Sequence, residues 1–278
     1  MKLGDYNTLR VARMSEIGLY LDGGQDVEIL LPKRYIPEGT KVDDELRVFL
    51  YLDQEERLIA TTQKPYAKVG DFACLECIWV NQYGAFLDWG LMKNLFCPFR
   101  EQRQRMEIGK SYIVHIHIDT DSYRIMASAK VGKFLNDNFP PYQNGDEVEI
   151  LVWQPTDLGY KVIVDNQFYG LVYRNQVFQP IHTGDRMKAF ISNVREDGKL
   201  DVALQPAGRQ QTKDFAEILL QYLKEHNGLC SLGDKSDAED IKELFHVSKK
   251  TFKRAAGDLF KRHLIMVGDT EVRLTDKA

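Results

Sequence analysis

Six aromatic residues crowd into residues 79–99, and their chemistry is that of stacking on flat apolar ligands. Aromatic rings hold the bases of a single strand without reading sequence, at about 1–3 kcal/mol for each base. Because strand side chains alternate between two faces, a small barrel cannot bury all six rings, although any one of them is about as often packed in a core. The six are Trp79, Tyr83, Phe86, Trp89, Phe96 and Phe99.

Tyr83 and Phe86 are three residues apart, so a regular strand would place them on opposite faces. Gly84 lies between them and permits a β-bulge, which would return both rings to one face. We therefore expect these two rings to act together.

A second group of candidate residues is basic and has helical spacing. Residues 249–262 hold six cations and one acid, Asp258. Four of the cations fall near the predicted N-terminal end of a helix, where a recognition helix presents side chains to a major groove. An ordinary solvated face, or a surface for RNA or protein, remains an alternative. The four are Lys249, Lys250, Lys253 and Arg254.

Metal-binding and catalytic patterns are weak. Cys74 and Cys77 have metal-ligand spacing but no second pair, and residues three apart on a strand face opposite ways. His115 and His117 share a strand face without a third ligand nearby, which favours an outward polar face. No phosphate loop or nucleophile elbow stands out. We predict no enzyme activity, no metal and no cofactor.

Charge is distributed unevenly along the chain. The net charge is −4, from 37 Lys and Arg against 41 Asp and Glu. Residues 1–62 carry −4, residues 63–144 carry +2, residues 145–207 carry −3 and residues 208–278 carry +1. Attraction of the whole chain to a polyanion is therefore excluded, so any affinity for nucleic acid must come from local patches and stacking.

Composition predicts a globular cytoplasmic protein. The chain of 278 residues is 44 % hydrophobic and has only four cysteines. It has no apolar run of ~18 residues and does not open on an apolar export segment. The few cysteines are expected to be free thiols in a reducing compartment, and no membrane partner is expected.

An internal repeat organises the first three quarters of the chain. Alternating apolar residues around a glycine occur at residues 17–22, 83–88 and, more loosely, 158–165, each followed by a second alternating segment that begins on a basic residue. From copy to copy the glycine recurs after 66 and 75 residues and the basic residue after 67 and 75. Such offsets indicate duplication of one small domain.

Each repeat unit has about five short strands and no long helix, which favours a closed barrel of the oligonucleotide-binding type. The predicted domains are barrels at 1–64, 65–132 and 145–207, with a Pro-containing linker at 133–144. After the break at residues 206–211, apolar spacing changes to 3.6 residues.

In the last segment, residues 212–278, the predicted helices and strands follow one another in the order found in winged-helix domains. A helix is predicted over 212–225, a second after a capping box of Ser236 and Glu239, and a third after the N-cap candidate Ser248. A hairpin around Gly268 follows. The fold class is thus mainly β, with three tandem barrels and an α+β winged helix-turn-helix domain.

Residues 79–88 resemble the core of S1-type RNA-binding domains, and residues 170–174 resemble their Gly-Leu-Val-His segment. Three such barrels and a winged helix resemble the bacterial conserved virulence factor B family along nearly the whole chain. The family resemblance implies RNA binding and regulation of gene expression. The aromatic before the repeat glycine is Ile17 in the first barrel and Leu158 in the third, so only the second barrel keeps both rings, and the first is interpreted as a packing module.

The resemblance implies an RNA face, because the S1 positions that match Tyr83, Phe86 and Arg124 bind RNA. The third barrel offers a more cationic version of this face. The complete predicted set is Tyr83, Phe86, Arg124, Trp89, Arg100, Lys161, Tyr173, Arg174 and Lys199.

We therefore expect a non-enzymatic RNA-binding regulator whose partner is single-stranded RNA, with duplex nucleic acid as a further partner of the winged helix and no small-molecule substrate. Two alternatives remain open. One is a DNA-binding transcriptional regulator that uses the winged helix, and the other is an interaction scaffold that touches no nucleic acid.

Overall fold

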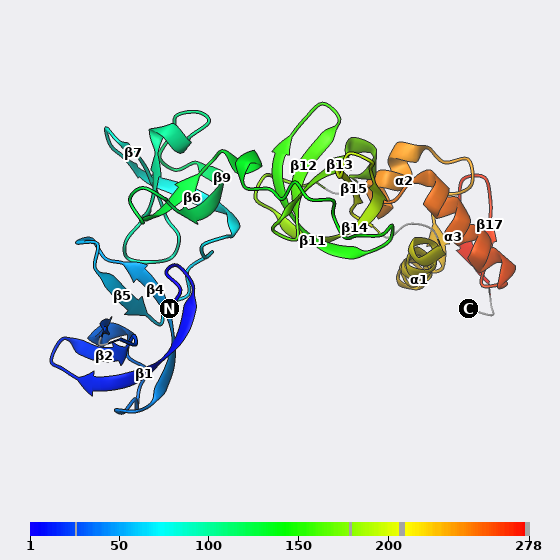
Figure 1. The fold of residues 1–278 in the computed structure, drawn as a ribbon. Coiled ribbons are helices and arrows are strands. Elements are labelled where there is room, and N and C mark those ends of the chain that lie inside the picture. Colours follow the sequence, from blue (N-terminus) through cyan, green and yellow to red (C-terminus); the bar gives the residue numbers. More distant parts are fainter. Residues whose placement is uncertain (26, 178–179, 206–208, 276–278) are drawn as a thin grey trace. The chain divides into compact units, whose positions relative to one another are not determined.

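The computed structural model of the chain describes residues 1–25, 27–177, 180–205 and 209–275. It divides into two compact units, Met1–Leu135 and Asn136–Ala278, which are described separately. The first holds two closed five-stranded barrels, and the second holds a third barrel and a small helical domain (Figure 1). The predicted fold class is confirmed. Within the described residues, no helix has the length and apolarity needed to cross a membrane.

The three barrels have the same topology. In each, the third and fifth strands pair in parallel and all other neighbours are antiparallel. Barrel 1 is formed by β1 (Tyr6–Met14), β2 (Gly18–Asp22), β3 (Glu28–Pro32), β4 (Glu45–Leu52) and β5 (Leu58–Thr61). Barrel 2 is formed by β6 (Phe72–Val80), β7 (Gly84–Leu87), β8 (Leu95–Pro98), β9 (Ser111–Ile118) and β10 (Ile125–Ser128). Barrel 3 is formed by β11 (Glu147–Pro155), β12 (Gly159–Val164), β13 (Phe168–Tyr173), β14 (Arg186–Val194) and β15 (Leu200–Ala203).

Short 3₁₀ turns follow the same strands. One turn succeeds the third strand of every barrel, and one more follows the last strand of barrel 2. They are η1 (Lys33–Tyr35), η2 (Phe99–Glu101), η4 (Arg174–Gln176) and η3 (Val131–Lys133).

The recurrence of glycine at one position of each repeat has a steric explanation. At the start of the second strand of each barrel, an added Cβ would lie 2.0–2.4 Å from a carbonyl oxygen of the facing third strand. A side chain there would push the two strands apart, so the position requires glycine. The three glycines and the carbonyls they approach are Gly18 and Leu31, Gly84 and Cys97, and Gly159 and Val172.

A β-bulge also recurs in the first strand of every barrel. The residue that follows it on the first strand pairs with the residue two positions after the glycine on the second strand. The register pairs are Arg13 with Tyr20, Trp79 with Phe86, and Gln154 with Lys161. The three barrels therefore present equivalent outer positions with different chemistry.

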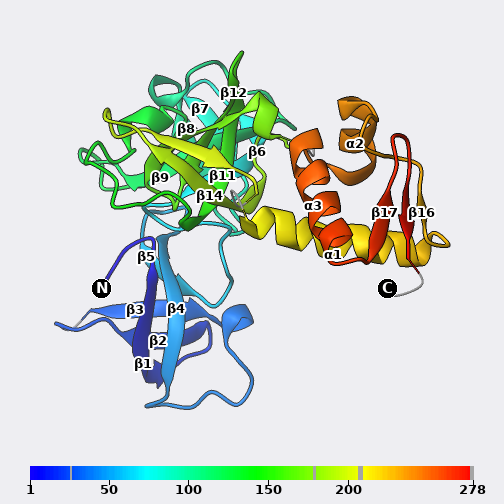
Figure 2. The same ribbon diagram turned by 90° about the vertical axis from the view of Figure 1, so that its right-hand side faces the viewer.

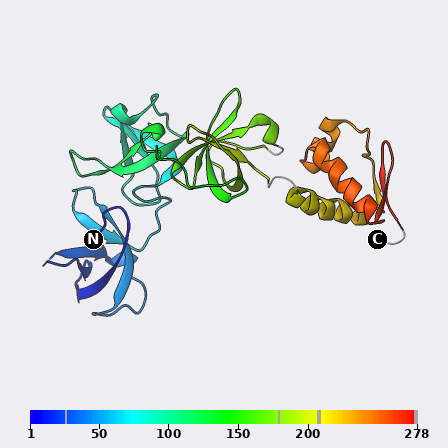
Figure 3. The same cartoon turned by 45° about the vertical axis from the view of Figure 1, so that its right-hand side comes forward.

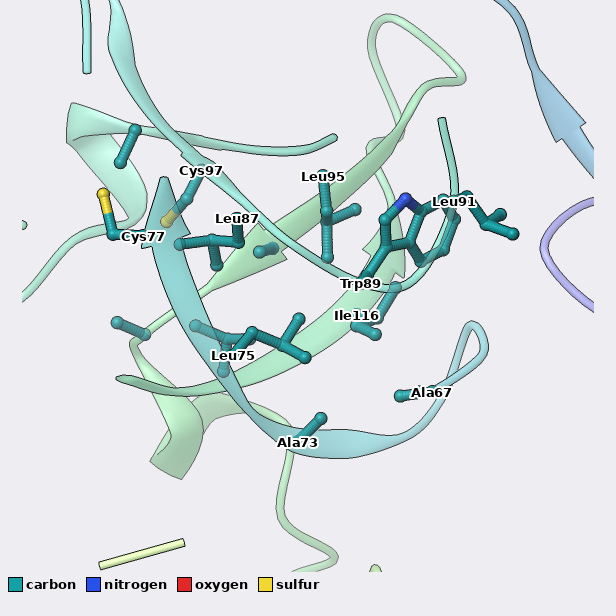
Figure 4. Close-up of a cluster of buried hydrophobic side chains, with 14 of the residues drawn as sticks. Ala67, Ala73, Leu75, Cys77, Leu87, Trp89, Leu91, Leu95, Cys97 and Ile116 are labelled. Carbon is teal, nitrogen blue, oxygen red and sulfur yellow. The ribbon is translucent and has the colours of Figure 1, made fainter. Parts of the chain in front are cut away.

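Barrel 2 has the largest core, and part of it comes from barrel 1. Phe49 and Tyr51 of β4 pack into the cluster that includes Trp89 and Leu91 (Figure 4 labels some of its barrel 2 members). The rings of Phe49 and Trp89 meet edge to face with centroids 5.9 Å apart. Because these contacts are apolar and buried, barrels 1 and 2 are one compact unit.

Of the linker predicted at 133–144, residues 136–144 pack on barrel 3. Pro140 is buried, and the Tyr142 hydroxyl donates a hydrogen bond to Asp165 at 2.8 Å. The Asn136 amide donates to the carbonyl of Gln167 at 2.8 Å.

The C-terminal domain has three helices and a three-stranded sheet, of which α1, α3 and the strands are visible in Figures 2 and 3. Its apolar core is its own, and the winged helix prediction is confirmed. Of the break expected at 206–211, residues 206–208 lie outside the described residues, and residues 209–211 already belong to the first helix, so the helix predicted from residue 212 begins earlier. The elements are α1 (Arg209–Glu225), β16 (Leu229–Cys230), α2 (Ala238–Phe245), α3 (Lys249–Lys261), β17 (Ile265–Val267) and β18 (Val272–Leu274).

Two details of this domain differ from expectation. The N-cap of α2 is Asp237, whose carboxylate accepts the Glu239 amide, while the Ser236 hydroxyl accepts the Gly233 amide one turn earlier. Ile218, an apolar residue of the helix predicted over 212–225, is 57 % exposed because it lies beside the buried stripe through Phe215 and Leu219. The N-cap of α3 is Ser248, as predicted.

Candidate nucleic-acid interface

An aromatic row crosses three strands on the outside of barrel 2. It consists of Trp79 on β6, Phe86 on β7 and Phe96 on β8, which are register partners in turn. Ring centroids are 4.7 Å apart for Trp79 and Phe86, and 5.1 Å apart for Phe86 and Phe96. Trp79 is 51 % exposed. The row is therefore a continuous aromatic surface with one end open to solvent.

Tyr83 stands beside this row, 66 % exposed, in the turn before β7. Its amide donates to the Asn81 side-chain oxygen at 2.8 Å, which closes an Asx turn. Tyr83 and Phe86 line the same cavity. The bulge proposed at Gly84 was wrong, because the bulge lies in β6 and Tyr83 precedes the strand.

The two predicted cations of barrel 2 are both ion-paired. Arg124 Nε donates to Glu56 of barrel 1 at 2.7 Å, and Arg100 pairs with Asp119 at 2.9 Å. Both guanidinium side chains remain more than half exposed. They can meet a phosphate only by sharing or exchanging these carboxylate partners.

Trp89 does not belong to the exposed face. It is 2 % exposed, its indole N–H donates to the Lys93 carbonyl at 2.6 Å, and it packs beside Leu91 in the core (Figure 4). Trp89, predicted as an RNA contact, is therefore not an exposed stacking ring: its indole packs against Phe49 of barrel 1, a partner that no local sequence pattern indicates.

A cavity of about 420 Å³ lies where barrels 1 and 2 meet, and we name it the junction cavity. Barrel 1 contributes three of its residues, from the end of β4 and the turn that follows; barrel 2 contributes the others. The lining residues are Tyr51, Leu52, Glu56, Asn81, Tyr83, Phe86, Trp89, Lys93, Asn94, Leu95, Phe96, Arg124, Ile125 and Met126.

Two polar contacts tie the barrels at this cavity. Lys93 Nζ donates to the backbone carbonyl of Asp53 at 2.6 Å, and Arg124 holds Glu56 at the rim. Burial lowers the pKa of the Lys93 ammonium, although the carboxylates of Glu56 and Asp53 partly offset this effect. Lys93 therefore brings a partly desolvated positive charge to the cavity wall.

The face of barrel 3 is cationic, and much of it is engaged. Lys161 Nζ lies 5.6 Å from the ring of Trp153 and 6.0 Å from that of Tyr169. The Tyr173 hydroxyl accepts from Arg195 at 2.7 Å. The two remaining predicted cations are Arg174, which donates to the Thr156 carbonyl, and Lys199, which pairs with Asp197.

In barrel 1, the positions equivalent to the aromatic row of barrel 2 are covered by side chains of barrel 1 itself. The Arg13 guanidinium lies 3.7 Å from the centroid of Tyr20 and also binds Glu28. Arg57 pairs with Asp53 and Glu55. A base cannot stack on Tyr20 unless Arg13 moves, so this face is closed by cation–π contact.

The predicted cations of α3 lie in its first two turns. Lys250, Lys253 and Arg254 are exposed and Lys249 is partly buried, while Phe252 and Ala255 of the same helix pack inward. Lys253 pairs with Asp234 at 2.9 Å. The cations thus form one outward surface at the N-terminal end of a packed helix.

His115 and His117 are not an outward polar face. The Phe134 ring stacks on His115 at 4.1 Å and lies 5.0 Å from His117. Burial and the neighbouring His117 lower the pKa of His115 to about 4. Within the part of the chain that the structure describes, no three His, Cys, Asp or Glu residues are grouped as metal ligands.

Sequence reasoning missed several residues of this site. Trp79 and Phe96 belong to the aromatic segment 79–99 but were not predicted as contacts. The density of aromatic residues in that segment was the signal that could have identified them. Lys93 of barrel 2 and the barrel 1 residues Tyr51 and Glu56 carried no local signal, because tertiary packing alone brings them to the cavity.

Two families of known domains match parts of this chain. The S1 domain model matches residues 3–63, and the CvfB-like winged helix domain model matches residues 217–274. Both are nucleic-acid-binding domain families and neither is an enzyme family.

Relatives cover most of the chain. Protein YitL of Bacillus subtilis strain 168 is 28 % identical over 269 residues, which are 94 % of this chain and 90 % of YitL. Conserved virulence factor B of Staphylococcus saprophyticus is 22 % identical over 284 residues, 99 % of this chain and 95 % of that protein.

A solved structure of a multidomain protein with nucleic acid binding domains from Streptococcus pneumoniae is 22 % identical and covers 98 % of both chains, with a TM-score of 0.44. The two domain matches and the full-length relatives confirm the predicted resemblance. This chain is a homologue of the conserved virulence factor B proteins and carries an S1 domain and a CvfB-like winged helix domain.

Proposed function

We propose that this protein binds single-stranded RNA through the aromatic row and Tyr83 of barrel 2, assisted by barrel 3 and by the cations of α3. Its role is then that of a non-enzymatic, cytoplasmic, post-transcriptional regulator of gene expression. The observation that carries the proposal is the row itself: of the three equivalent outer positions, only the pair Trp79 and Phe86 is aromatic on both strands.

The chemistry favours a single strand over a duplex. In a duplex the faces of the bases are stacked on one another, whereas an unpaired strand can splay its bases onto protein rings. Lys93 and Arg124 line the same cavity as Phe86 and Phe96 and supply local positive charge for the phosphates, although the chain as a whole is acidic.

The test is competition at fixed salt. Labelled single-stranded homopolymeric RNA bound to the full chain is challenged with unlabelled RNA or with duplex DNA of equal length. Displacement by RNA at much lower concentration supports the proposal. Preferential displacement by duplex DNA favours the alternative in which the winged helix reads DNA, and absence of RNA binding favours a protein scaffold.

Replacing both Tyr83 and Phe86 by Ala should weaken RNA binding by more than ~10-fold, because two stacking platforms are lost. A matched control removes two other exposed rings, Tyr66→Ala with Tyr123→Ala. Circular dichroism must show both variants folded. Equal affinities of the two folded double variants would assign the RNA face elsewhere.

A further inference from the structure

Barrel 1 builds one wall of the junction cavity, although its own S1-type face is covered. Tyr51 and Leu52 stand at the end of β4 and Glu56 follows in the turn, and Phe86 and Phe96 of the aromatic row line the same cavity. The cavity is therefore continuous with the row that we propose to bind RNA.

The size and lining of this space suit one nucleobase. A volume of about 420 Å³ lies in the range of small-molecule pockets, which are mostly apolar with a few convergent polar groups. Tyr51 and Phe86 supply flat apolar surface for a heterocycle. Asn94 adds an amide with both a donor and acceptor, which a base edge can use.

The lining of the cavity includes the charges that a nucleotide requires. Lys93 and Arg124 both line the cavity, and burial already weakens the hydration of the Lys93 ammonium. A phosphate at the mouth would meet these cations while its base lies inside. Both are held at the site, Lys93 by the Asp53 carbonyl and Arg124 by Glu56, so the cations are in place before a ligand arrives.

The walls of the cavity are held together by packing that does not depend on a ligand. Phe49 of barrel 1 contacts Trp89 of barrel 2, and Tyr51 belongs to the same buried cluster. A preformed cavity costs less to fill, since its side chains are ordered before binding.

We propose that the junction cavity receives one unstacked nucleobase, with barrel 1 supplying one wall, so that barrel 1 takes part in recognition through Tyr51 and Leu52 and not through its own barrel face. This inference rests on the proposed binding of single-stranded RNA and assigns it a discrete base site. The base arrives either within an RNA strand or as a free nucleotide.

The experiment is photocrosslinking of the full chain with a short single-stranded RNA that carries 4-thiouridine, followed by mass spectrometry of tryptic peptides. The proposal places an adduct on residues 48–57, which lie in barrel 1 and contain Tyr51 and Leu52. A parallel arm uses free 4-thiouridine monophosphate. An adduct with the strand alone identifies RNA as the source, and one with the monophosphate identifies a nucleotide site.

A filling variant tests the same cavity without photochemistry. Leu52→Trp adds bulk at a partly buried position of the wall and leaves every residue of the aromatic row in place. It should lower RNA affinity about tenfold, as expected for one lost base contact. Val42→Trp is the matched control, because it adds the same side chain at an exposed barrel 1 position outside the cavity and should bind as the parent does.

The outcomes separate this inference from the proposed function. If the parent binds RNA, but residues 48–57 acquire no adduct in either arm and folded Leu52→Trp binds normally, the base site is wrong and RNA binding stands. If RNA fails to bind, the proposed function is wrong. The experiment with the monophosphate then tests the base site by itself. An adduct on residues 48–57 supports the base site, and the absence of an adduct overturns it.

Discussion

At the scale of single residues, the ion pair of Arg124 and Glu56 limits the charge that the cavity can offer. Arg124 Nε donates to Glu56 at 2.7 Å, and both side chains are partly exposed. An exposed pair of this kind contributes little to stability, so its main consequence is electrostatic competition with a phosphate for the guanidinium.

Glu56→Gln should therefore strengthen RNA binding, by about three- to fivefold at low salt, because the competing carboxylate is removed. The measurement is a binding isotherm at two salt concentrations. Glu55→Gln is the matched control, since this neighbouring carboxylate pairs with Arg57 and does not line the cavity. An equal gain in both variants would mean that only net charge changed.

His115 makes the stability of barrel 2 depend on pH. Burial, and next the neighbouring His117, lower its pKa from 6.5 to about 4, and the pKa of His117 is lowered by burial as well. In the unfolded chain both would titrate near 6.5. The unfolded state thus binds more protons between these values, so the folded state loses stability as pH falls through this window.

We expect the free energy of unfolding to be level above about pH 7 and to drop by about 1–2 kcal/mol between pH 6.5 and 4.5, a modest size because solvent reaches part of the rings. Urea unfolding at several pH values measures it. His115→Phe keeps a ring against Phe134 and should reduce the slope. An unchanged slope in that variant would place the titrating group elsewhere.

At the scale of elements, the second strand of each barrel begins with a glycine, which allows the third strand to approach closely. Gly84→Ala should destabilise barrel 2 by about 2–3 kcal/mol, since the new Cβ would lie 2.4 Å from the Cys97 carbonyl oxygen and 2.8 Å from the Pro98 Cα. Thermal unfolding is the measurement.

Gly132→Ala serves as the control, because nothing lies within 4 Å of its added Cβ and the residue belongs to the short turn η3. It should leave the unfolding temperature nearly unchanged. If both variants melted alike, the close approach of β7 and β8 would not explain the glycine at position 84.

At the scale of the whole molecule, the winged-helix domain has its own apolar core and an outward cationic end on α3. We propose that the domain boundaries follow from this, so that residues 1–207 and residues 208–278 each fold alone. Residues 1–207 should bind single-stranded RNA, and residues 208–278 should bind it weakly or not at all.

The tail should still raise the affinity of the intact chain, because a tethered second site acts at an effective concentration near the millimolar range. Replacing its four predicted cations by Gln should lower the affinity several-fold, to the value of residues 1–207. Two isotherms decide this: if residues 1–207 already match the full chain, the tail serves another partner. The four are Lys249, Lys250, Lys253 and Arg254.

The sequence alone determined the three barrels and the winged helix, because the features that encode them are local. Strand alternation, the repeat glycine and helical spacing each extend over a few residues and recur at a fixed interval. The helix cap at Ser248 and the hairpin at Gly268 were predicted for the same reason. The aromatic density of residues 79–99 likewise marks the candidate face, since it too is a local property of the chain.

Only the tertiary structure decided which of those residues reach solvent and which meet across domains. Trp89 is buried because Phe49 of barrel 1 packs against it, and Arg124 meets Glu56, which lies 68 positions earlier in the chain. Neither partner follows from residue type or spacing. Burial and charge pairing depend on packing between distant segments, whereas periodicity reports only the local backbone, so the junction cavity had no signature in the sequence.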